Sequence, residues 1–186
     1  ITMRIMRFSD SQDASDLIAG TAPLPNPGEG EILVRVHAVG VTPTESQWYP
    51  TTHTQDGGIR TGAIPGHEFS GVIEAVGVNV DPSQIGRAVY GMNDWFADGA
   101  TADYCVSVLE AVADKPPSLS HLGAASVTIG ALTAWQGLFA RAKLRRGERI
   151  LVHGGSGAVG LFAIQLARRA GAHVITTASA RNFELL

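Results

Sequence analysis

The sequence predicts two architectures in succession, namely a domain of short β-strands followed by the beginning of a parallel α/β unit. Segments of alternating apolar and polar residues, separated by turn signals rich in Gly and Pro, recur up to residue 108. After Pro116 and Pro117, the apolar residues fall at helical spacing. Residues 149–177 then follow the order strand, glycine turn, helix, strand, which is typical of a βαβ unit.

Composition excludes several classes of partner. The chain has 186 residues, 45% of them hydrophobic and 17% charged, with a formal net charge of −3. This balance gives no electrostatic attraction to nucleic acid or anionic lipid, so we expect neither as a partner. No stretch approaches the ~20 apolar residues of a membrane span, and we expect a cytoplasmic protein. The single cysteine, Cys105, excludes an intrachain disulfide and any zinc site with two thiolates from this chain.

The β part is predicted from alternation. Residues 31–41 place Ile32, Val34 and Val36 on one face, which is typical of a half-buried strand. Cys105 lies within a similar pattern, and we expect it to be an inert core residue. Residues 42–66 are irregular and rich in Thr, Gly and Pro, which predicts a long loop of the kind that carries function. Strands are expected over residues 3–8, 31–41, 69–78, 87–92 and 101–108, and strands this short and closely spaced favour a barrel or sandwich.

The α/β part is predicted from a change of period. Residues 121–144 are Ala-rich with helical spacing, whereas residues 149–153 are a short apolar run, as in a strand buried on both faces. Residues 173–177 predict the next strand, and Gly171 stands where the preceding helix should end. The helix, over residues 159–170, is expected to bury Val159, Phe162, Ala163, Leu166 and Ala170. We therefore expect one domain over residues 1–120 and the first part of a second over residues 121–186.

The glycine turn is the strongest chemical signal. Read from Gly155, it fits the pattern G-x-G-x-x-G between a strand and a helix. Glycines there allow a tight turn, close approach of a pyrophosphate and close helix packing, while free N–H groups at the helix start face the anion. The alternative is a glycine turn that only packs a helix on a sheet. The predicted cofactor-binding residues of this turn are Gly155, Ser156, Gly157, Ala158, Val159 and Gly160.

The segment after the second strand favours NADP(H) over NAD. An NAD site usually has a carboxylate near this point to bind the ribose 2′-hydroxyl, but here the first acid is Glu184. Ser179 and Arg181 could instead bind a 2′-phosphate. The alternative is that Ser179 caps a helix and Arg181 is solvated.

The motifs together resemble the zinc-free branch of the medium-chain dehydrogenase/reductase superfamily, the quinone oxidoreductase and zeta-crystallin group. The matching stretches, in family order, are residues 40–45, 65–72, 101–104 and 132–135 and the glycine turn. The resemblance implies a GroES-like β-barrel domain followed by the first part of a Rossmann domain. It also implies a homodimer in which NADPH reduces quinones or α,β-unsaturated carbonyls without zinc. Two alternatives remain open, an enoyl-thioester reductase and a non-catalytic NADPH-binding or structural protein.

The sequence departs from the zinc enzymes of this superfamily. Thr42 stands where they have a ligand Cys, and where the zinc-free group commonly has Asn. His67 and Glu68 resemble the remaining part of a zinc site, but a catalytic site needs three protein ligands, so we expect no metal. The chain also stops after the second of the six strands expected in a Rossmann sheet. We therefore expect it to be a fragment, the ordered part of a longer protein, or a chain that a partner completes.

Hydride transfer from a nicotinamide requires residues that orient the substrate and polarise its carbonyl. The loop after residues 31–41 supplies Thr42 and Tyr49 as candidate catalytic residues, since the Tyr49 hydroxyl could donate to developing oxyanion charge. Trp48 and Trp95 are candidate substrate-binding residues, and Thr128 is expected near the nicotinamide from the resemblance. The alternative for Trp48 and Tyr49 is ordinary loop packing, and the alternative for Trp95 is a subunit contact. The alternative for Thr128 is a small buried residue at a helix start.

Overall fold

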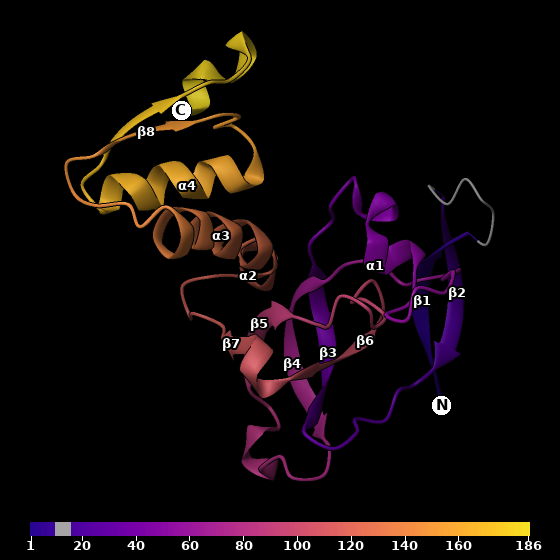
Figure 1. Ribbon diagram of the computed structural model, residues 1–186. Coiled ribbons are helices and arrows are strands. Elements are labelled where there is room, and N and C mark those ends of the chain that lie inside the picture. Colours follow the sequence, from indigo (N-terminus) through magenta and orange to yellow (C-terminus); the bar gives the residue numbers. More distant parts are fainter. Residues whose placement is uncertain (10–15) are drawn as a thin grey trace. The chain divides into compact units, whose positions relative to one another are not determined.

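The computed structural model describes residues 1–9 and 16–186 and divides into two compact units, Ile1–Ser126 and Val127–Leu186 (Figure 1). Each unit is described by itself. The first contains the predicted β domain, and the second contains the predicted βαβ unit. The domain boundary predicted at residues 120 and 121 precedes helix α2 (His121–Ala125), which the structure assigns to the first unit.

The first unit is built on an open five-stranded antiparallel sheet. Its strands, in spatial order, are β6 (Tyr104–Val108), β3 (Glu31–Val39), β4 (Glu68–Val76), β5 (Ala88–Met92) and β7 (Val112–Asp114). A separate antiparallel pair consists of β1 (Thr2–Phe8) and β2 (Leu17–Pro23). Ile5 of β1 forms an isolated bridge to Ala102. Over the residues described, the strands do not form one closed ladder, so the first unit is more open than the barrel that we predicted.

Alternation explains the core of this unit. Ile32, Val34, Phe69, Ile73 and Val89 are almost completely buried, and they come from three adjacent strands. Each such side chain stabilises the folded state by roughly 1.5–3 kcal/mol when it is fully buried rather than exposed. Cys105 joins this core, so its predicted place in the core is confirmed, and burial raises the pKa of its thiol.

Short helical segments connect the strands of the first unit. In the loop predicted over residues 42–66, η1 (Glu45–Gln47) and α1 (Tyr49–Thr52) are followed by a bridge between His53 and Ile59. Elsewhere, η2 (Pro82–Gln84) and η3 (Leu109–Ala111) are single 3-10 turns. The loop predicted as functional is therefore locally ordered.

The second unit confirms the βαβ prediction. β8 (Arg149–Val152) and β9 (His173–Thr176) are parallel, and α4 (Ala158–Arg169) joins them. α4 lies between this strand pair and α3 (Thr128–Trp135) (Figure 1). A π-helical turn, η4 (Gln136–Arg141), follows α3, and η5 (Ala180–Leu185) follows β9. At the end of α4, Gly171 has φ +82° and its N–H donates to the Arg168 carbonyl, as predicted for a helix end.

The helical spacing over residues 121–144 is divided among α2, α3 and η4, since Ser126 leaves helical geometry with ψ 2° and ends α2. One detail of the α/β prediction is wrong. The strand expected to be buried on both faces, β8, leaves Leu151 53% exposed. Within the described residues a helix covers only one face of the β8–β9 pair, so alternate side chains face outward.

The buried face of α4 matches the predicted one in part. Ala163 is buried, and Phe162 and Leu166 pack against the same core, whereas Val159 is 39% exposed. Gly160 and Ala167 are also buried, and α3 approaches closely, since a Cβ on Gly130 would lie 3.0 Å from the Phe162 ring. Small residues therefore occupy this helix contact.

No helix within residues 1–9 and 16–186 combines the length and apolar character needed to cross a membrane.

Candidate functional site

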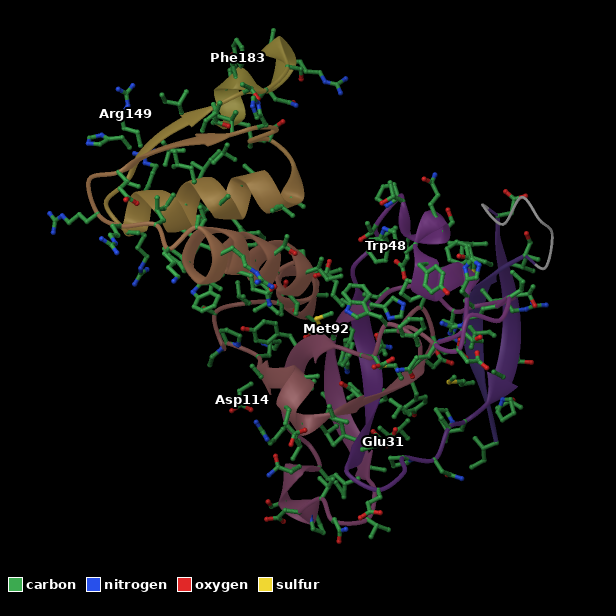
Figure 2. The ribbon with its side chains drawn as sticks, in the orientation of Figure 1. Glu31, Trp48, Met92, Asp114, Arg149 and Phe183 are labelled. Carbon is green, nitrogen blue, oxygen red and sulfur yellow. The ribbon has the colours of Figure 1, made fainter. Side chains whose placement is uncertain are left out.

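An aromatic cluster lies in the first unit, on the loops that follow β3 and β5. We define it as Trp48, Tyr49, Trp95 and Phe96. The Trp48 and Trp95 ring centroids are 5.4 Å apart in an edge contact, and those of Tyr49 and Phe96 are 6.5 Å apart, also edge to face. In Figure 2, Trp48 lies at the end of the sheet opposite to Glu31, which begins β3. The structure thus brings the two predicted substrate-binding residues together.

The two predicted catalytic residues lie on the same loop. Tyr49 is 54% exposed and stacks on His53, with ring centroids 4.4 Å apart and planes within 4°. The Thr42 carbonyl accepts a hydrogen bond from the Glu45 N–H at 3.0 Å, which starts η1. Their catalytic roles stay predictions, but Tyr49 presents polar and aromatic surface beside the cluster.

A buried histidine supports the aromatic cluster. His67 is 2% exposed, and its ring lies 5.2 Å from that of Trp95. The Asn93 side-chain amide donates to the Asp98 carbonyl at 2.8 Å, so its Oδ1 accepts from Nδ1 of His67 at 3.0 Å. The neutral imidazole therefore carries its proton on Nδ1, and its Nε2 faces Oε1 of Glu45 at 3.6 Å.

The Glu45 carboxylate is also buried, at 3% exposure, and its Oε1 accepts from the Gly66 N–H at 2.7 Å. Burial raises the pKa of Glu45, and the nearby Glu68 charge raises it further. Burial lowers the pKa of His67. Both shifts favour an uncharged pair. Sequence reasoning singled out His67 but missed Glu45, because a glutamate in a polar loop is usually solvated.

No group of three or more His, Cys, Asp and Glu side chains among the described residues is placed to hold a metal ion. The absence of zinc stays a prediction.

The glycine turn in the second unit fits a dinucleotide phosphate. A Cβ on Gly155 would lie 2.1 Å from the Thr176 hydroxyl, and one on Gly160 would lie 2.3 Å from the Gly154 carbonyl. These two glycines therefore serve internal packing. A Cβ on Gly157 would meet only the Gly154 carbonyl, at 3.3 Å, so this position leaves space beside the turn.

The start of α4 presents backbone donors next to that space. Gly157 is the N-cap residue and offers no side chain to accept from the first turn, which begins with Ala158 and Val159 and has no acidic residue. The helix dipole and unsatisfied N–H groups at such an end favour an anion. Of the predicted cofactor-binding residues, Gly157, Ala158 and Val159 are exposed at this helix start, whereas Gly155 and Gly160 are buried beneath the turn.

The segment predicted to contact a 2′-phosphate is tied to the glycine turn. Asn182 donates from Nδ2 to the Ser156 hydroxyl at 3.0 Å and to the Ser179 hydroxyl at 3.2 Å. Arg181 is the adjacent residue and is exposed. Sequence reasoning missed Asn182, because its position next to Arg181 gives no sign that it would contact Ser156.

Thr128 carries an orphaned polar atom. It is the first residue of α3 and is 6% exposed, and its buried Oγ1 has no hydrogen-bond partner. A buried hydroxyl without a hydrogen-bond partner lowers the free energy of unfolding, unless a ligand group bonds to it. This observation fits the predicted contact with a cofactor amide.

Comparison with protein families decides the identity of the chain. Residues 28–143 match the alcohol dehydrogenase GroES-like domain. The chain belongs to the medium-chain dehydrogenase/reductase superfamily. The match includes the loop with Tyr49, the buried His67 and the segment with Trp95, so the aromatic cluster lies within the family domain.

Relatives of this superfamily include both kinds of reductase expected from the sequence. The trans-enoyl reductase pgmF of Aspergillus terreus is 31% identical, over 99% of this chain and 55% of its own length. The quinone oxidoreductase of Coxiella burnetii is similar in structure, with a TM-score of 0.89 and 29% identity over 100% of this chain and 59% of that one. Mycobacterial Rv1454c, solved in complex with NADPH, has a TM-score of 0.82 and 29% identity over 98% and 54%. The chain spans about half the length of the relatives that it matches.

Proposed function

We propose that the protein containing this chain is an NADPH-dependent reductase of flat, conjugated carbonyl compounds, either quinones or α,β-unsaturated carbonyls, and works without zinc. The observation that carries the proposal is the glycine turn before α4, where Gly157 leaves open space beside unsatisfied helix N–H groups. Membership of an oxidoreductase superfamily and the NADPH complex of a structural neighbour support the same reading.

The residues of the two units have separate roles in this proposal. When bound, the reduced nicotinamide supplies a hydride from its C4 atom. The glycine turn holds the pyrophosphate, and Thr128 donates to or accepts from the nicotinamide amide through its otherwise unpartnered hydroxyl. Trp48 and Trp95 bind the flat substrate, and the Tyr49 hydroxyl donates to its carbonyl oxygen as negative charge develops there.

Preference for NADPH over NADH is proposed from the segment after β9. Ser179 and Arg181 offer a hydroxyl and a guanidinium to a 2′-phosphate, and Asn182 holds this segment to Ser156 of the glycine turn. Glu184 lies further along η5, so the position next to β9 has no carboxylate to repel a phosphate.

A second candidate function is reduction of enoyl thioesters, favoured by the similarity to the trans-enoyl reductase of Aspergillus terreus. For an enone and for an enoyl thioester, the hydride goes to the carbon β to the carbonyl and a proton goes to the α-carbon, so the same residues would serve either substrate. These two substrates differ in whether the carbonyl belongs to a ketone or to a thioester, while a quinone would take up the hydride and a proton to give a hydroquinone.

The test is oxidation of NADPH, followed by its absorbance, with a panel of quinones, enones and enoyl thioesters. We expect turnover with at least one flat conjugated substrate and slower turnover with NADH. Tight NADPH binding without turnover on any member would contradict the proposal and support a non-catalytic binding protein.

A further inference from the structure

The Arg60 side chain connects the two loops that carry the aromatic cluster. It is only 12% exposed although it belongs to a surface loop. Its Nη1 donates to the Pro50 carbonyl at 2.9 Å, and its Nη2 donates to the Ala97 carbonyl at 2.9 Å. Pro50 directly follows Tyr49, and Ala97 directly follows Phe96. One guanidinium therefore spans the two chain segments whose rings face each other.

Asp98 completes this connection. Its Oδ1 accepts from Nη2 of Arg60 at 2.8 Å and from the Ile64 N–H at 3.2 Å. The Asp98 carbonyl accepts from the Asn93 side-chain amide, and Asn93 also accepts from His67, whose ring contacts that of Trp95. The guanidinium is thus linked through hydrogen bonds to both sides of the cluster.

Only arginine has the geometry for this position. Its planar guanidinium presents several donors in a fixed fork, so it can bond two carbonyls and one carboxylate at the same time. A lysine ammonium would keep the charge but is a point donor on a flexible stem. The backbone of Arg60 adds a further anchor, since its N–H donates to the Thr52 carbonyl at 2.9 Å.

We propose that Arg60, held by Asp98, is a positioning residue that fixes the spacing between the Trp48–Tyr49 side and the Trp95–Phe96 side of the aromatic cluster, and thereby sets the affinity for a flat substrate. This inference rests on the proposed function for its substrate. The spacing itself is a property of the free protein and can be measured without turnover.

The test replaces Arg60 and uses two readouts. The difference between the near-ultraviolet circular dichroism of the parent and that of W95F reports the edge contact between Trp48 and Trp95, whatever other tryptophans the protein contains. We expect R60A to lose most of this signal while the far-ultraviolet spectrum stays unchanged. We also expect KM for the substrate to rise roughly tenfold, the equivalent of about 1.4 kcal/mol, with a smaller change in kcat.

Two further variants separate positioning from charge and from folding. R60K should behave like R60A, and added guanidinium at concentrations well below denaturing should restore the R60A signal. If R60A does not fold, D98N serves in its place, because it weakens the contact between Asp98 and Arg60 without removing the guanidinium, and it should cause a smaller loss of the circular dichroism signal. The matched control is R87A, which removes an ion pair to Asp114 at 2.6 Å, away from Trp48 in Figure 2, and should change neither readout.

The outcomes distinguish the two proposals. If R60A and D98N keep the parental spectrum and the parental KM, the positioning role is wrong, whatever the activity. If the spectrum changes but no substrate of the panel is reduced by the parent, the positioning of the rings stands and the proposed function fails.

Discussion

The Nε2 atom of His67 faces Oε1 of Glu45 at 3.6 Å, and both side chains are almost completely buried. The Asn93 amide fixes the His67 proton on Nδ1, so the neutral ring presents a lone pair to the carboxyl group. Burial shifts both pKa values toward the uncharged forms, upward for Glu45 and downward for His67. The stability of the first unit should therefore depend on pH in two opposite ways.

The His67 effect should appear on the acid side of its ordinary pKa of 6.5. Between that value and the lowered pKa of the folded state, the unfolded chain binds more protons at this position. The free energy of unfolding should therefore fall as the pH falls through this range. Urea unfolding of the parent and of His67→Asn, which can still donate to Asn93, measures the difference.

Glu45→Gln provides the matched comparison. Because the folded-state pKa of Glu45 is raised above 4.5, its contribution is present below that value and is lost as the pH rises through the raised pKa. In the parent, the free energy of unfolding should therefore fall as the pH rises through this range, and Glu45→Gln should remove that fall. His67→Asn should instead remove the fall that occurs as the pH is lowered. Parallel pH profiles for both variants and the parent would contradict the assignment.

Two glycine substitutions separate packing from cofactor binding. Gly160→Ala places a Cβ 2.3 Å from the Gly154 carbonyl and should reduce the free energy of unfolding by about 2 kcal/mol. Gly157→Ala meets only one atom, at 3.3 Å, and should fold normally but bind NADPH at least about tenfold more weakly. Thermal melting and fluorescence titration with NADPH measure the two effects. Unchanged NADPH affinity in Gly157→Ala would show that the phosphates do not approach this position.

Thr128→Val tests the role of the unpartnered hydroxyl. The substitution keeps the shape but removes a buried polar atom that has no partner, so the free energy of unfolding should stay the same or rise by roughly 1 kcal/mol. The affinity for NADPH should fall, because the proposed bond to the nicotinamide amide is lost. Denaturant unfolding with and without NADPH measures both quantities. A stable variant with parental affinity would remove Thr128 from the cofactor site.

Arg181→Ala tests the preference for NADPH. Loss of a charge-assisted bond worth roughly 1.5–3 kcal/mol should weaken NADPH binding by about 10- to 100-fold and leave NADH binding unchanged. Calorimetric titration with each cofactor measures the two affinities. Arg169→Ala, at an exposed position in the last turn of α4, is the control and should change neither. An equal loss for both cofactors would instead indicate a general electrostatic effect.

Local pattern was sufficient for much of the fold. The alternation at Ile32 and Val34 predicted a buried strand face, and the glycines after β8 predicted a βαβ unit. β2 escaped prediction because most of its side chains are exposed, and an edge strand without a buried face shows no alternation. The spacing over residues 121–144 indicated helix but did not locate the end of α2, because an Ala-rich segment keeps helical spacing across it.

The supporting residues of the site were harder to predict than its surface residues. Trp48 and Trp95 stand out as aromatic residues in polar loops, and the structure brings their rings together. Glu45 and Arg60 do not stand out, because charged loop residues are usually solvated. Their burial depends on the partners Gly66 and Asp98, and the sequence alone does not show these contacts.

Hydride transfer from NADPH to a conjugated substrate is tested most directly with NADPH that carries deuterium at the transferred C4 position and with an α,β-unsaturated ketone or thioester. We expect deuterium on the β-carbon of the product by NMR, and a proton from solvent on the α-carbon. A product formed without the label, or no product from any quinone, enone or enoyl thioester despite bound NADPH, would contradict the proposed function.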